Sequence, residues 1–60
     1  AQDAKKGFEY LMKAAMKDHP QANYELGECY KHGLGVTPNA IVANKLHQKA
    51  KTLGYTNTSQ

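Results

Sequence analysis

Apolar and small residues recur at helical spacing in three segments of the chain, and this pattern predicts three α-helices. We expect the helices at about 4–17, 20–32 and 40–53. Asp3 and Asn39 are placed to cap the first and third helices, because their side chains can accept hydrogen bonds from amides one turn in. Pro20 ends the first helix and suits the first turn of the second. The pattern therefore predicts an all-α fold over 1–54, followed by a polar tail at 55–60 that we expect to fray.

Glycines mark two places where the backbone needs special freedom. Gly33 is expected to form a left-handed cap at the end of the second helix, and Gly35 to supply a second loop angle that other residues adopt poorly. We expect Leu34 and Val36 to tuck under the helices. Gly27 lies inside the second helix, where glycine costs about 1 kcal/mol relative to alanine. It is therefore expected to mark a close contact with a neighbouring backbone.

The first and third helical segments are related by a shift of 36 positions. Small residues fall on small ones and large on large, as in the pairs Gly7 and Ala43, Tyr10 and Leu46, and Ala14 and Ala50. A period in the mid-thirties built from two helices is typical of an α/α solenoid. The chain then holds one complete helical hairpin plus a preceding helix. Because solenoid units need neighbours, we expect the isolated chain to be marginally stable.

The second helix and its following loop carry the motif Leu-Gly-x-x-Tyr-x-x-Gly-x-Gly-Val, which begins at Leu26. This motif and the period resemble the Sel-one-like repeat family, which is related to tetratricopeptide repeats. The resemblance implies a TPR-like solenoid and an adaptor or scaffold role in assembling protein complexes, without chemistry of its own. Its structural motif falls on Ala14, Ala22, Leu26, Gly27, Tyr30, Gly33, Gly35, Val36, Asn39, Ala43 and Ala50.

Two sets of residues are candidates for partner binding. Phe8, Met12 and Met16 widen the apolar surface of the first helix, and we expect their exposed side to pack against a neighbouring unit. Flexible methionine side chains adapt well to binding partners. On the second helix, the candidates off the packing stripe are Asn23, Tyr24 and Lys31. They could line a concave groove, although Tyr24 could equally pack against the next repeat. The expected partner is another protein or further repeats of a longer parent chain, and the polar tail with Lys51 resembles a C-terminal cap.

Composition narrows the remaining function classes. The chain has eight lysines and no arginine, a net charge of +3, and no apolar run long enough to span a membrane. A small basic three-helix nucleic-acid-binding domain remains the alternative, although base and phosphate recognition lean on arginine and the middle helix carries Glu25 and Glu28. A salt titration with duplex DNA separates the two hypotheses.

Catalytic or metal chemistry would rest on Cys29 and His32, which lie three positions apart. A metal site needs four ligands and a nucleophile needs a base and an oxyanion site, and neither set is evident. We therefore expect no enzyme activity, cofactor, metal or small-molecule substrate. Ala1-Gln2-Asp3 would suit a processed exported protein, whereas the single Cys29 fits a reducing compartment. Periplasmic, secreted and cytosolic locations all stay open.

Overall fold

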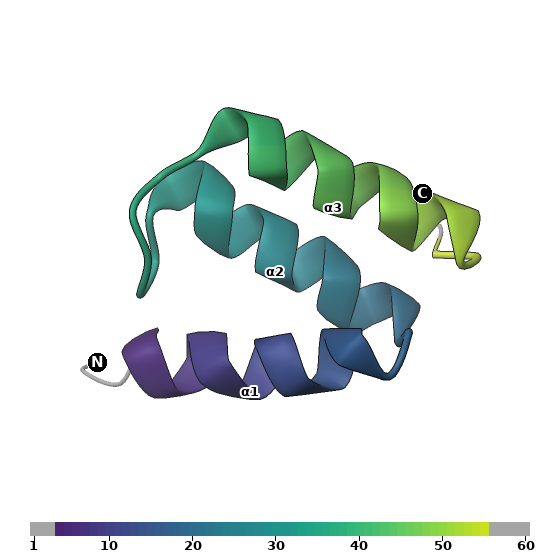
Figure 1. Cartoon of the computed structure of the whole chain (residues 1–60), viewed down its shortest axis with the longest axis horizontal. Coiled ribbons are helices and arrows are strands. Elements are labelled where there is room, and N and C mark those ends of the chain that lie inside the picture. The colour runs from purple at the N-terminus through teal and green to yellow at the C-terminus, as the bar shows by residue number, and fades with distance from the viewer. Residues whose placement is uncertain (1–3, 56–60) are drawn as a thin grey trace, which may run out of the picture.

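The computed structural model describes residues 4–55, and these form three helices without a strand. Helix α1 spans Ala4–Met16, α2 spans Pro20–His32 and α3 spans Ala40–Thr52. Figure 1 shows α2 between α1 and α3, and it packs against both. The all-α prediction is confirmed, with α1 and α3 each ending one residue before the expected position. The predicted cap Asp3 and positions 56–60 of the expected tail lie outside the described residues.

Helices α2 and α3 approach each other closely because small residues face the contact. Ala43 and Ala50 are 2% and 0% exposed. A Cβ atom added to Gly27 would lie 2.5 Å from Cδ2 of His47 and 3.1 Å from the carbonyl oxygen of Ala43. The expected close contact at Gly27 is confirmed. The neighbour is the imidazole ring of His47 as well as the backbone of α3.

Helix α1 packs against α2 through a small core of Ala15, Ala22 and Leu26. The ring of Phe8 meets Tyr30 edge-on, with ring centroids 5.5 Å apart. The expectation that Phe8 stands on the exposed side of α1 is therefore wrong. Phe8 lies one helical turn before Leu11 and two turns before Ala15, so it shares the side of α1 that faces α2. Ala14, Leu11 and Leu46 complete the partly buried surroundings of this core.

Asn23 is a structural residue of the junction between α1 and α2. Its side chain is 1% exposed, and its Nδ2 atom donates to the carbonyl oxygen of His19 at 2.9 Å and to that of Ala15 at 3.5 Å. The expectation that Asn23 lines a partner-binding groove is therefore wrong. A middle helix that packs on two sides buries a wider arc than one stripe, and Asn23 falls inside that arc. Its amide satisfies carbonyl groups where one helix ends and the next begins.

The loop between α2 and α3 relies on two left-handed glycines. Gly33 has φ 71° and its amide donates to the carbonyl oxygen of Cys29, while Gly35 has φ 76°. A Cβ atom added to Gly35 would lie 2.6 Å from the carbonyl oxygen of Ala4. The predicted roles of both glycines are confirmed, and Gly35 also lets the loop touch the start of α1. Val36 is half-buried, but Leu34 is exposed, so the expectation that Leu34 tucks under the helices is wrong.

Asn39 caps α3 as predicted. Its Oδ1 atom accepts from the amides of Ile41 at 3.1 Å and Val42 at 3.2 Å. Its own amide donates to the carbonyl oxygen of Tyr30 at 2.8 Å. The residue therefore fixes the start of α3 and also ties it to the end of α2.

Helices α1 and α3 are equivalent in local structure. Each has 13 residues, and both ends are related by the shift of 36 positions. The turns that follow also correspond, because Asp18 and Gly54 both have positive φ, at 61° and 103°. The amide of Asp18 donates to Ala15 at 2.9 Å, and the amide of Gly54 donates to Lys51 at 3.0 Å. The sequence repeat is thus a repeat of local structure.

Candidate functional site

The side of α3 that α2 covers has an uncovered counterpart on α1. Ala43, Leu46 and Ala50 of α3 correspond to Gly7, Tyr10 and Ala14 of α1 under the 36-residue shift. Ala43 and Ala50 are buried, whereas Tyr10 is 70% exposed. No atom lies within 4 Å of a Cβ added to Gly7. We call Gly7, Tyr10 and Ala14 the α1 face, and it is the candidate docking surface of the described residues.

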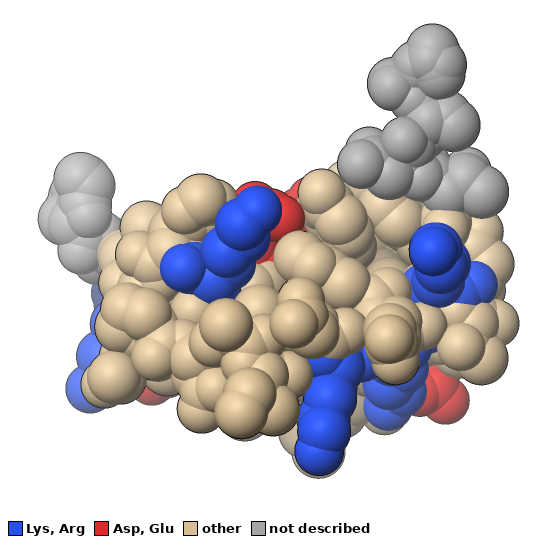
Figure 2. All heavy atoms as spheres, turned by 90° about the horizontal axis from the view of Figure 1, so that it is seen from above, with Lys and Arg blue, Asp and Glu red and all other residues tan. Residues whose placement is uncertain are grey.

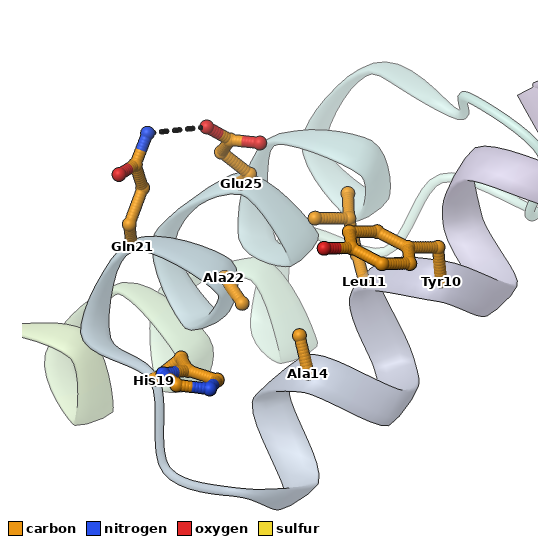
Figure 3. Close-up of a pocket in the computed structure, with 7 residues that line it drawn as sticks. All are labelled: Tyr10, Leu11, Ala14, His19, Gln21, Ala22 and Glu25. Atoms are coloured by element: carbon orange, nitrogen blue, oxygen red, sulfur yellow. Dashed lines mark hydrogen bonds between the residues drawn. The ribbon is translucent and has the colours of Figure 1, made fainter.

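A groove of about 380 Å³ lies between the α1 face and α2. Figure 3 shows Tyr10 and Leu11 on one side, His19 on the other, and the small side chains of Ala14 and Ala22 between them. Gln21 and Glu25 of α2 are joined at one rim by a hydrogen bond of 2.9 Å. A second hollow of about 260 Å³ continues along Tyr10 and Ala14 past Lys13 and Lys17. The groove therefore follows α1. The small apolar side chains of Ala14 and Ala22 lie at its floor, and the polar side chains of Gln21 and Glu25 lie at its rim.

This arrangement suits a helix better than a compact ligand. Small residues at Gly7, Ala14 and Ala22 leave room for a backbone to approach, as Gly27 and Ala43 do between α2 and α3. Fully burying a large apolar side chain contributes about 1.5–3 kcal/mol, so covering Tyr10, which is 70% exposed, would contribute about 1–2 kcal/mol. Tyr10 is thus the single largest apolar contribution available on this face.

Met12 and Met16 lie on a different side of α1. Met16 is 80% exposed and Met12 is 40% exposed. Residues two positions apart on a helix point to nearly opposite sides, so Met12 faces away from Tyr10. Lys31, at the other end of α2, is exposed. The exposure expected of the methionines is observed, and a role for them in binding stays a prediction.

Tyr24 is held in a stack of three rings within the chain. Its ring centroid lies 4.6 Å from that of His47 and 4.7 Å from that of Tyr55, with interplanar angles of 25° and 20°. The ring thus packs within its own hairpin and is half-buried, and a role of Tyr24 in partner binding stays a prediction. Tyr55 was expected to fray, and this is wrong: its amide donates to the carbonyl oxygen of Ala50 at 2.9 Å. The negative charge of Glu28, more than burial, raises the pKa of Tyr24.

Glu28 lies between two histidines at the α2–α3 contact. Its Oε1 atom is 3.2 Å from Nε2 of His32, and its Oε2 atom is 3.3 Å from Nε2 of His47. The contact with His47 is close enough for electrostatic attraction when the ring is protonated, but it is not aligned as a hydrogen bond. Nε2 of His47 is buried and has no hydrogen-bond partner among residues 4–55. The carboxylate therefore serves the packing of the hairpin.

The thiol of Cys29 is poorly suited to nucleophilic chemistry. It is a buried free cysteine, and burial raises its pKa, with smaller effects from Glu25 and Glu28. A raised pKa keeps the thiol protonated and unreactive. Within the described part of the chain, no three His, Cys, Asp or Glu side chains gather in a way that could hold a metal ion.

The surface charge and helix lengths bear on the remaining function classes. Figure 2, seen from the α3 side, shows the lysines in separate groups with uncharged surface between them. Nucleic-acid-binding surfaces usually gather their cations into one patch or stripe. None of the helices between residues 4 and 55 has the length and apolar character required to cross a membrane.

The α1 face was not predicted from the sequence as a binding surface, although the signal was present. Gly7, Tyr10 and Ala14 already pair with Ala43, Leu46 and Ala50 under the 36-residue shift. The sequence alone does not show that α2 packs against this side of α3. Once the structure shows which residues of α3 are buried against α2, the 36-residue shift identifies the corresponding exposed residues of α1.

Comparison with known proteins gives matches to a family and to one curated relative. The family model described as Sel1 repeat matches residues 1–19 and 20–55. DAP3-binding cell death enhancer 1 of Rattus norvegicus is 38% identical over 52 residues, which cover 87% of this chain and 10% of the relative. The chain therefore corresponds to about a tenth of that protein's length. No solved structure matches the chain.

Proposed function

Because the chain belongs to the Sel1 repeat family, whose repeats generally mediate contacts between proteins, we propose that it is an adaptor module that docks on a helix through its α1 face. The docked helix belongs to a partner protein or to a further repeat of a longer chain. The module brings polypeptides together and performs no catalysis. It is a TPR-like helical repeat unit in which a hairpin, α2 and α3, supports a preceding helix, α1.

The observation that supports this proposal is the difference between two equivalent helices. The side of α3 that contains Ala43 and Ala50 is buried by α2. The same side of α1 carries Tyr10 in the open and nothing near Gly7. Because the two helices share length, turn geometry and small-residue spacing, the surface that accepts α2 in one copy is available in the other.

The occupant can be described by its chemistry. Helix α2 meets α3 with Gly27 opposite Ala43, so the approach requires a small residue on the incoming helix. A helix that docks on the α1 face should likewise present a small residue opposite Gly7 and an apolar residue over Tyr10. Lys13 and Lys17 line the outer hollow and favour acidic residues at the edge of that helix.

The length of the relative limits what can be carried over from it. Its name describes a protein that binds DAP3, but the matched segment is 10% of that protein. The similarity supports contact through a repeat unit and leaves the partner unassigned. On the face that Figure 2 shows, the lysines do not form one patch, and no observation on the described residues favours the nucleic-acid alternative.

The test is a binding titration with a synthetic peptide that copies residues 19–37, which contain α2. We expect saturable binding by fluorescence anisotropy, and we expect Tyr10→Lys to weaken it about tenfold through loss of buried apolar area. The matched control Met16→Lys makes the same kind of change on the other side of α1 and should weaken binding less than about twofold. A peptide of scrambled order should not bind.

The same variants identify the site of docking. If the peptide merely replaced α2 on α3, Tyr10→Lys would leave its affinity unchanged. Equal effects of Tyr10→Lys and Met16→Lys, or no binding of the ordered peptide, would contradict the proposed docking on the α1 face.

A further inference from the structure

The outer side of α3 differs in chemistry from the corresponding side of α1. Helix α1 packs on α2 with Phe8, Leu11 and Ala15. The 36-residue shift places Asn44, His47 and Lys51 at these positions of α3. A second helix of the apolar α2 type would find no apolar surface to bury there. The outer side of α3 therefore offers a polar surface where α1 offers a packing surface.

Three neighbouring hollows lie on this polar surface, and Gln48, Lys51 and Thr52 line one of about 400 Å³. Asn44, His47, Gln48 and Lys51 line a second of about 230 Å³. His47 and Lys51 also line the third, of about 210 Å³, together with Tyr24 and Tyr55. We call the six residues that line the two hollows containing His47 the α3 groove. Each of the two hollows that include His47 is smaller than a typical small-molecule pocket of about 300–1,000 Å³, so this pair suits successive side chains of an extended segment.

One wall of the α3 groove is ordered before any partner arrives. Tyr24 stacks on His47 at 4.6 Å and on Tyr55 at 4.7 Å. The amide of Tyr55 donates to the carbonyl oxygen of Ala50 at 2.9 Å, which fixes the backbone of Tyr55 at the end of α3. Rigid aromatic rings supply contact area at low cost in conformational entropy.

The charge of α3 defines the partner. The helix carries Lys45, Lys49 and Lys51 and no acidic residue. Lys49 lies 3.7 Å from Asp18, so its charge is partly matched within the chain. Glu28 contacts His47 from α2 but does not line either hollow of the α3 groove, whereas Lys51 and the amides of Asn44 and Gln48 do. The positive charge of Lys51 complements carboxylate side chains, and the amides of Asn44 and Gln48 complement the backbone of a bound segment.

We propose that the α3 groove binds an extended acidic segment of a partner protein. Lys51 pairs with a carboxylate of that segment, Asn44 and Gln48 bond to its backbone, and Tyr55 covers an apolar part of it. The groove is a second surface, separate from the α1 face because α2 lies between the two helices (Figure 1). The module would thereby hold a helix on one side and an acidic segment on the other.

The test is a titration of the whole chain with a synthetic peptide of about ten residues in which glutamate alternates with alanine and serine. At low ionic strength, NMR should show saturable shifts of the amides of Asn44, Gln48 and Lys51. Lys51→Glu should weaken binding about tenfold, because a favourable charge pair becomes a repulsive one. Lys45→Glu makes the same charge change on the same helix, outside both hollows of the α3 groove, and should weaken binding less than about twofold.

Two further titrations test whether the peptide's charge and the position of the groove determine binding. The same peptide with glutamine in place of glutamate should bind about two- to fivefold more weakly, because it loses the charge pair with Lys51. Tyr10→Lys should leave the acidic peptide's affinity unchanged, which distinguishes this surface from the α1 face. No binding, equal losses for Lys51→Glu and Lys45→Glu, or tighter binding of a duplex DNA oligonucleotide at the same ionic strength would each overturn the proposal.

Discussion

Replacing Gly27 with alanine tests the closest contact in the fold. Alanine is favoured over glycine by about 1 kcal/mol in a helix interior. At this position the added Cβ would lie 2.5 Å from Cδ2 and 2.7 Å from Nε2 of His47, and 3.1 Å from the carbonyl oxygen of Ala43. The imidazole cannot move freely, because it stacks on Tyr24 at 4.6 Å. Overpacking of this kind costs about 1–3 kcal/mol, so we expect Gly27→Ala to lower the free energy of unfolding by about 1 kcal/mol.

Urea unfolding followed by circular dichroism measures this change, and the chain offers a matched control. Gly7 also lies inside a helix, but no atom lies within 4 Å of its added Cβ. Gly7→Ala should therefore raise the free energy of unfolding by up to about 1 kcal/mol. Removing the ring with His47→Ala should relieve most of the clash, so Gly27→Ala should be close to neutral in that background. A Gly27→Ala variant as stabilised as Gly7→Ala would refute the reasoning.

Three further changes probe other parts of the fold by the same unfolding measurement. Asn39→Ala removes the cap that accepts from Ile41 and Val42 and should cost about 1 kcal/mol, whereas an Asn39→Ser variant should retain most of the stability. Gly35→Ala should cost more than about 1 kcal/mol, because φ is 76° and the Cβ would lie 2.6 Å from the carbonyl oxygen of Ala4; an unchanged midpoint would mean that the loop does not touch α1. The raised pKa of Cys29 means that the unfolded thiol ionises first, so stability present below about pH 9 should fall as pH rises from there toward the folded pKa. Cys29→Ala should reduce this alkaline loss above about pH 9, and an identical slope in the variant would contradict the assignment.

Local signals in the sequence were sufficient to predict the three helices and where they begin and end. Pro20, Gly33 and Asn39 act on their immediate neighbours, and each does in the structure what its chemistry predicts. The 36-residue repeat could also be recognised, because under this shift small residues align with small residues and large residues with large ones. These features depend on short-range geometry that the order of residues specifies directly.

The burial of single side chains could not be predicted in the same way. Asn23 is buried because α2 has a neighbour on each side, and the width of its buried arc depends on both. Phe8 lies inward because of the side that α1 turns toward Tyr30. Tyr55 is ordered because Tyr24 provides a ring to stack on. Each of these outcomes depends on a contact between helices, which one sequence read along its length does not define.

Adding a helix in front of the α1 face tests the central claim most directly. A chain in which a copy of residues 20–38 replaces residues 1–2 places a second α2 before α1 in the same 36-residue register. If the α1 face is the surface on which such a helix packs, the helical content should increase. The free energy of unfolding should rise by about 1–2 kcal/mol, largely through burial of Tyr10. Tyr10→Lys in the extended chain should remove most of that gain. An unchanged free energy of unfolding, with the added segment contributing no helix, would contradict the account.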